Sequence, residues 1–258
     1  ALVEPFAGTD AASSDFGTGG GAGNTYPGAV VPFGMLQWSP DTAPGKNNAA
    51  GGYTYADTQI RGFSLTHLSG AGCGIFQDVP LLPTLTPIER SPSLPKSYLV
   101  APEFVPGFSH ADEAAEPGSY RVRLDPGTER AIDVELAATT RSGVGRFTFP
   151  ASEAATVLFN AGGSSMANGD AAFRVDPSRR EVSGSIESGQ FCYHRNRYRL
   201  YFVARFERDF ESFGTWERQD LHPGGTSASD HAEQPFQLRP ISGVPGESTA
   251  RNGAQAGA

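Results

Sequence analysis

The stretch RYRLYFVARF at positions 197–206 decides the fold class of this chain. Every second residue from Tyr198 to Phe206 is apolar, and the other set of alternate positions includes Arg197, Arg199 and Arg205. Successive side chains of a β-strand point to opposite faces, so this pattern predicts a strand with one buried and one exposed face. The stretch IDVEL at 132–136 alternates apolar and acidic residues in the same way.

Weaker apolar stretches predict further strands at 30–38, 79–85, 146–149, 155–160 and 211–217, the last paired with 197–206. Helical periodicity is weak throughout, and 32 glycines with 20 prolines fit many turns between short strands. We therefore expect an all-β fold, a large β-sandwich, as one domain over residues 1–258. Residues 87–119 and the tail 219–258 are expected to be rich in loops, and the chain is expected to end before the last strand of the sandwich.

Composition excludes several classes of protein. The chain of 258 residues has a net charge of −8 and no cluster of lysines or arginines, so we expect no nucleic-acid partner. No apolar run approaches the roughly 18 residues that a membrane helix needs, so we expect no membrane partner. The first residues, ALVEP, have no initiator methionine and look like a processed or cut N-terminus. We expect a secreted or extracytoplasmic protein.

A first candidate binding segment follows the glycine-rich stretch at 17–23. Gly23 allows close approach of the backbone to a ligand, Asn24 and Thr25 supply hydrogen-bonding groups, and Tyr26 supplies an aromatic plane suited to a sugar ring. The alternative interpretation is a loop that simply enters a core strand, because glycine-rich loops are common. A phosphate-binding loop is excluded, since the lysine that ends such a motif is missing.

A second candidate segment, at 62–74, places His67, Ser69 and Cys73 between glycines that include Gly72 and Gly74. A Ser–His or Cys–His nucleophile needs an orienting carboxylate, which normally comes from a distant segment. A structural histidine and a buried cysteine are the simpler interpretation.

The remaining reactive side chains indicate no definite site. Cys73 and Cys192 are the two cysteines, and they either form one disulfide or remain two buried thiols. The acidic cluster Asp112, Glu113 and Glu116 is interpreted as a solvated loop. No cluster has the spacing of a zinc site or of a calcium loop.

Six stretches of the sequence match motifs of one known family. They are TYPGAVVPFGMLQWSPDT (25–42), GYTYAD (52–57), GFSLTHLSGAGC (62–73), PGSYRVRL (117–124), ELAATTRSG (135–143) and YRLYFVARF (198–206). Any one of them alone would be weak support, but together and in this order they resemble glycoside hydrolase family 92, the calcium-dependent exo-α-mannosidases.

The resemblance implies a two-domain enzyme in which an N-terminal β-sandwich packs on an (α/α)₆ barrel. It implies an inverting mechanism with one general acid and one general base, and Ca²⁺ bound to the sugar hydroxyls. In the family, the acid, the base and most calcium ligands lie in the barrel. We therefore expect no catalytic residue and no metal ligand in this chain; neither Asp78 nor Glu89 is assigned such a role.

The resemblance implies that the sandwich supplies one wall of the pocket for a mannose-containing glycan, with its own C-terminal catalytic domain as partner. The substrate-binding candidates are Gly23, Asn24, Thr25, Tyr26, Gly72, Cys73 and Gly74, with His67 and Ser69 as residues that brace the loop. Some relatives carry a bulky aromatic residue where Cys73 stands, so a mannosyl phosphodiester is an alternative substrate.

A stand-alone carbohydrate-binding module is a further alternative. Trp38, Tyr53 and Tyr55 would then form a platform on which a sugar stacks. A hydrolase with a Ser or Cys nucleophile built on His67 is the third alternative.

Overall fold

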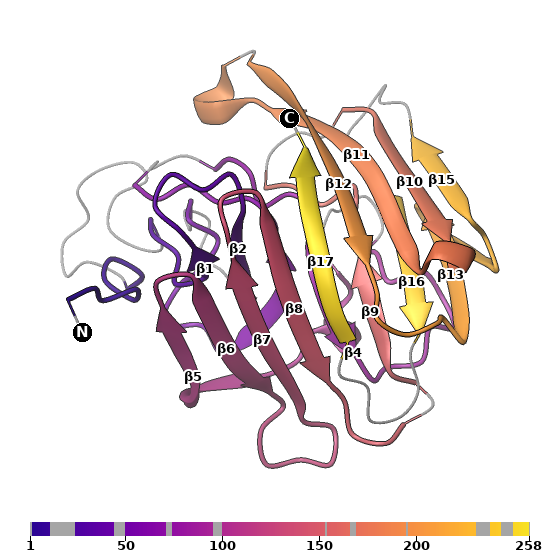
Figure 1. Cartoon of the computed structure of the whole chain (residues 1–258), viewed down its shortest axis with the longest axis horizontal. Coiled ribbons are helices and arrows are strands. Elements are labelled where there is room, and N and C mark those ends of the chain that lie inside the picture. The colour runs from indigo at the N-terminus through magenta and orange to yellow at the C-terminus, as the bar shows by residue number, and fades with distance from the viewer. Residues whose placement is uncertain are drawn as a thin grey trace.

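The computed structural model describes residues 2–10, 24–43, 50–70, 74–94, 100–152, 154–165, 169–194, 196–230, 238–243 and 250–257. These residues form two antiparallel β-sheets that face each other (Figure 1). Three short 3₁₀ turns, at Pro102–Phe104, Pro177–Arg179 and Phe191–Tyr193, are the helical elements of the described part. No helix in these ranges is long and apolar enough to cross a membrane. The predicted all-β sandwich is confirmed.

The first sheet has eight strands. Their order is β1 (Ala29–Val30), β2 (Gln37–Ala43), β3 (Gln59–Ser64), β4 (Leu81–Thr84), β9 (Thr156–Phe159), β16 (Leu238–Gly243), β13 (Ser212–Glu217) and β14 (Asp220–Pro223).

The second sheet has nine strands and lies in front in Figure 1. Their order is β15 (Ser227–Asp230), β10 (Ala171–Asp176), β11 (Glu181–Gly189), β12 (Arg197–Arg205), β17 (Ala250–Gly257), β8 (Ser142–Thr148), β7 (Ile132–Ala138), β6 (Ser119–Leu124) and β5 (Phe108–Glu116).

The core lies between the two sheets and is built by alternation along the strands. Phe202 and Ala204 of β12 are buried, whereas Arg205 is exposed, as the sequence pattern predicts. Trp38 of β2 lies against Gly145 of β8, where an added Cβ would come within 2.5 Å of the indole ring. The indole Nε1 donates a hydrogen bond to the carbonyl oxygen of Phe63 at 3.1 Å. Trp38 is therefore a core residue.

Several sequence-based boundaries are wrong for identifiable reasons. The expected strand 30–38 is interrupted, because the segment 31–36, which contains Pro32 and Gly34, turns between β1 and β2. The stretch 211–217 does form a strand, but β13 belongs to the other sheet, between β16 and β14, and does not pair with β12.

Two segments expected to be loops contain strands. Residues 108–116 form β5, an edge strand whose register with β6 shifts between Phe108 and Glu113, so its side chains lose the period of two. The segment 219–258 contains β14, β15, β16 and β17. These strands are short or rich in small and polar residues, and backbone pairing with neighbouring strands holds them in place.

Candidate functional site

Both candidate segments lie at one end of the sandwich. At this end β3, β9 and β11 finish and β2, β4 and β12 begin, as the antiparallel registers require. The β11–β12 turn marks the same end, uppermost in Figure 1. Residues 24–28 lead into β1, and residues 65–70 leave β3. The topology therefore brings together two segments that lie about 40 residues apart in the sequence.

Direct contacts join the two segments into what we call the candidate rim: Asn24, Tyr26, His67 and Gly70. The backbone N–H of Gly70 donates to the carbonyl oxygen of Asn24 at 2.5 Å. The rings of Tyr26 and His67 lie 5.0 Å apart between centroids, tilted by 37°. These contacts bring the described parts of the two predicted segments together at one end of the sandwich.

Tyr26 is the half-buried aromatic residue of the rim. Burial raises the pKa of its phenol to about 12, so the hydroxyl keeps its proton at neutral pH. The described residues offer this hydroxyl no hydrogen-bond partner. Tyr26 therefore presents both a ring and a free donor.

His67 lies beneath Tyr26 and is held on both ring nitrogens. Nδ1 lies 2.8 Å from the carbonyl oxygen of Gln37, so it donates there, and Nε2 lies 3.1 Å from Oδ1 of Asp41. The other oxygen of Asp41 accepts a hydrogen bond from the hydroxyl of Ser64. Because the side chain of His67 is 0% exposed, it braces Tyr26 from below and has no surface for a ligand.

A second buried carboxylate, Asp78, ties together the loops behind the rim. Its Oδ2 accepts from Thr66 Oγ1 and from Tyr198 Oη, each at 2.7 Å, and its Oδ1 accepts from Ser164. We call these four residues the Asp78 cluster. Burial raises the pKa of the Asp78 carboxyl, although the hydroxyl donors oppose that shift.

The backbone around Asp78 is strained. Phe76 and Gln77 both have φ of 59°, and Val79 has φ of 53°. Non-glycine residues, and β-branched ones above all, rarely adopt this left-handed region. The Asp78 cluster therefore holds a loop conformation that the local sequence would not choose.

The other site candidates have separate positions. Thr25 donates from Oγ1 to the carbonyl oxygen of Ala7 at 2.8 Å, so its hydroxyl fixes the N-terminal segment. Ser69 is exposed and Gly74 is half-buried. Gly23, Gly72 and Cys73 lie outside the described residues. Cys192 is disulfide-bonded, and Cys73 is the one other cysteine of the sequence.

The nucleophile hypothesis built on His67 is wrong for the described residues. Both of its ring nitrogens are engaged, one by the Gln37 carbonyl oxygen and one by Asp41. Ser69 makes no contact with the ring, and Ser64 bonds to the far oxygen of Asp41. No hydroxyl group in these ranges is therefore placed for activation by His67.

The described residues do not fit a calcium ion either. They contain no group of three His, Cys, Asp or Glu side chains close enough to bind a metal. The buried carboxylates accept from protein hydroxyls: Asp41 from Ser64, Asp57 from Thr42 and Asp78 from its cluster.

Sequence reasoning missed a third polar cluster, on β5. Glu113, with a side chain that is 1% exposed, accepts from Tyr53 Oη at 2.8 Å and Tyr120 Oη at 2.5 Å, and His110 Nδ1 lies 2.8 Å away. The i,i+3 spacing of His110 and Glu113 is the one signal the sequence carries. Because Tyr53 and Trp38 are buried, these two residues do not form the stacking platform with Tyr55 that the alternative of a binding module requires.

Comparisons with known proteins identify the family of this fold. The chain matches the model of the glycosyl hydrolase family 92 N-terminal domain over residues 2–256. It is 26% identical to the family 92 α-mannosidase BT3965 from Bacteroides thetaiotaomicron, solved with mannoimidazole, with a TM-score of 0.78 over 99% of this chain and 32% of that one. It is 27% identical to the family 92 glycosyl hydrolase ccman5, with a TM-score of 0.79 over 99% of this chain and 32% of that one.

A third solved structure shares the fold. The inverting mannosidase BT2199 from Bacteroides thetaiotaomicron is 24% identical, with a TM-score of 0.70 over 98% of this chain and 30% of that one. No curated protein matches the chain. This chain spans about a third of the length of the solved proteins. From the match over nearly its whole length, the chain belongs to glycosyl hydrolase family 92, as an N-terminal domain of that family.

Proposed function

We propose that this chain is the N-terminal part of a secreted, inverting exo-α-mannosidase, and that its candidate rim forms one wall of the pocket for the terminal mannose. Family membership supports the hydrolase class. The observation that carries the role of the rim is the joining of two separate family motifs through Gly70 and Asn24 and through Tyr26 and His67. A disulfide at Cys192 agrees with an oxidising compartment.

The chemistry of the rim suits a sugar. An aromatic ring can cover the apolar face of a pyranose, while a phenol and an amide bond to its hydroxyl groups. Tyr26 supplies the ring and a protonated phenol, and Asn24 lies two residues before it on the same segment. His67 and Asp41 fix the orientation of Tyr26, which limits the conformational entropy lost on binding.

In this proposal the chain binds and orients the sugar and excludes water from one side, while the proton transfers belong to residues outside it. The general acid, the general base and the calcium ligands are then supplied by the remaining two thirds of a protein of the family's length. A chelator is expected to abolish turnover by the full-length protein and to leave the thermal unfolding of this chain unchanged.

The test is the steady-state hydrolysis of an aryl α-mannoside by the full-length protein and two variants of Tyr26. Tyr26→Phe removes one hydrogen bond and should lower kcat/KM by about tenfold, and Tyr26→Ala, which also removes the ring, by about a hundredfold. Tyr201→Phe, on the exposed face of β12, is the matched control and should change nothing. Full activity of Tyr26→Ala would refute the role of the rim.

Two further assays separate the alternatives. Turnover of a mannosyl phosphodiester faster than of the aryl α-mannoside would favour the phosphodiesterase of the same family. Turnover by the 258 residues alone would show that the catalytic residues lie in this chain, contrary to the proposal.

A further inference from the structure

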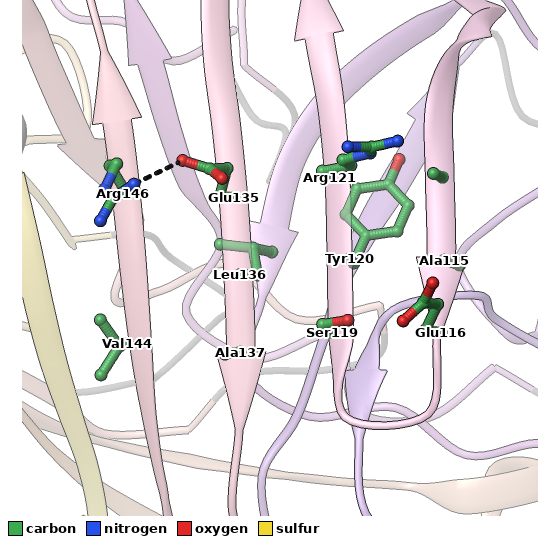
Figure 2. A pocket seen from close by; sticks show the side chains of 11 residues that line it. Ala115, Glu116, Ser119, Tyr120, Arg121, Glu135, Leu136, Ala137, Val144 and Arg146 are labelled. Atoms are coloured by element: carbon green, nitrogen blue, oxygen red, sulfur yellow. Dashed lines mark hydrogen bonds and ion pairs between the residues drawn. The ribbon is translucent and has the colours of Figure 1, made fainter.

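A cavity of about 400 Å³ opens on the outer face of the nine-stranded sheet (Figure 2). It crosses β5, β6, β7 and β8, and none of the rim residues lines it. We call it the outer-face groove. Its volume lies within the range of small-molecule sites, roughly 300–1,000 Å³.

The registers explain why the sheet is hollow here. Ser119 of β6 pairs with Ala137 of β7, so this row across the outer face carries two adjacent small side chains, and Ala137 pairs in turn with Val144 of β8. The next row pairs Arg121 with Glu135 and Glu135 with Arg146. The long charged side chains of the second row form a wall beside the hollow left by the first.

The wall presents hydrogen-bond donors that the protein does not use. Arg146 donates from Nη1 to Glu135 at 3.2 Å, and its side chain, 40% exposed, lines the groove, whereas its Nε is buried and has no partner among the described residues. Arg121 has no ion pair or hydrogen bond within those residues, and in Figure 2 its guanidinium points away from Glu135, toward β5.

The opposite end of the groove presents an acceptor. Glu116, the last residue of β5, is exposed and pairs in register with Ser119. The described residues include no hydrogen-bond donor to its carboxylate. The groove therefore offers unused donors along one wall and an unused acceptor at its end, on a floor of small side chains.

This arrangement selects the chemistry of a ligand. A simple anion would pair with Arg121 but would be repelled by Glu116 and Glu135. An apolar segment would leave all three charges desolvated and unpaired. A neutral polyol both donates and accepts, so its hydroxyl groups satisfy the guanidinium groups and the carboxylate together.

We propose that the outer-face groove is a second glycan-binding site that holds a neutral hexose unit of an α-mannan chain. The hexose lies over Ser119 and Ala137, accepts from Arg121 and Arg146, and donates to Glu116. The class of sugar rests on the proposed function, whereas the presence of a polyol site rests on the groove alone. The site lets the protein hold a long glycan while its terminal mannose occupies the pocket beside the rim.

Affinity electrophoresis of the protein in gels that contain soluble α-mannan tests the proposal. Arg121→Gln removes the unused cation and should weaken binding by about tenfold, the worth of one charge-assisted hydrogen bond. Ala137→Phe fills the hollow with a residue that strands tolerate on an exposed face, and should abolish retardation by this site. Arg123→Gln is the matched control, since Arg123 lies on the same strand and face, outside the groove, in an ion pair with Asp133.

Three results would overturn the inference: no retardation of the unchanged protein, equal weakening by Arg121→Gln and Arg123→Gln, or full competition by inorganic phosphate, which would make the groove an anion site. Hydrolysis of an aryl α-mannoside is measured in parallel, because that small substrate cannot span both sites. Groove variants should keep this activity. For the unchanged protein, hydrolysis without retardation by mannan counts against the groove, and retardation by mannan without hydrolysis counts against the proposed function.

Discussion

The rim end of the sandwich and the outer-face groove both concentrate polar side chains, but in opposite physical settings. Asp78 and His67 are buried, and each forms hydrogen bonds with residues of several different segments. Arg121 and Glu116 are exposed and have no such partners among the described residues. The first region uses polar groups to hold backbone, and the second leaves them available to a ligand.

The difference follows from the energy of burial. A buried carboxylate is tolerated only with hydrogen-bond partners, so the residues around it become mutually dependent. An exposed charge on a sheet is solvated whether or not it is paired, so it can be exchanged at little cost. Substitutions should therefore affect stability at the rim end and ligand binding at the groove.

Removal of the Asp78 carboxylate is expected to have the largest effect. Asp78→Ala leaves the hydroxyls of Thr66, Ser164 and Tyr198 without their acceptor and should lower the free energy of unfolding by about 3 kcal/mol. Urea denaturation measures this loss in the free energy of unfolding. Asp133→Ala, on the exposed face of β7, is the control, and equal losses for the two variants would remove the contrast between the regions.

Two glycines test the packing beneath the rim. Gly52 and Gly70 have φ of 84° and 77°, so alanine is strained at both, by about 1 kcal/mol. An added Cβ at Gly52 would lie 2.6 Å from Oδ1 of Asp41, whereas one at Gly70 would have no atom of the described residues within 4 Å. Gly52→Ala should therefore lower the free energy of unfolding by about 2 kcal/mol, and Gly70→Ala by about half of that, as measured by urea denaturation. The reverse order would mean that Asp41 and His67 are not held as tightly as the structure indicates.

The pH dependence of Asp78 gives a smaller effect. Because burial raises the pKa of its carboxyl, the folded chain keeps this proton to higher pH than the unfolded chain, whose pKa is near 3.8. The contribution of the carboxyl to stability is fully present below that value and falls as the pH rises toward the folded pKa. The difference in the free energy of unfolding between the unchanged chain and Asp78→Asn isolates this carboxyl, because the other titrations cancel. This difference should shrink between pH 4 and pH 7. An advantage that grows over this range would contradict the raised pKa.

Strands with a buried face were predictable, and strands held by pairing alone were not. The period of two in 197–206 gave β12 and the exposed face of Arg205, because the inward side chains are apolar. β5 has no such pattern, since it is an edge strand with a shifted register. Its Glu113 was interpreted as solvated, yet the shift turns it toward Tyr53 and Tyr120.

The candidate site was predictable as a pair of segments and not as a set of contacts. Family motifs pointed to residues 23–26 and 67–74, and the pairing of β2 with β3 brings Asp41 beside His67. The sequence separation of these two residues gives no sign of their ion pair. The outer-face groove was not predictable, although the stretches 117–124 and 135–143 contribute to its lining, because it forms only when four strands are in register.

The smallest effect on stability is expected from the charged wall of the groove. Arg146 and Glu135 lie 3.2 Å apart with side chains 40% and 53% exposed, so solvent screens their attraction. Glu135→Gln should change the free energy of unfolding by less than about 0.5 kcal/mol, and 0.5 M salt should reduce even that. Urea denaturation at low and high salt measures both values. A loss comparable to that of Asp78→Ala would mean that the outer face also holds the fold together, and its unpaired donors could then no longer be taken as free for a sugar.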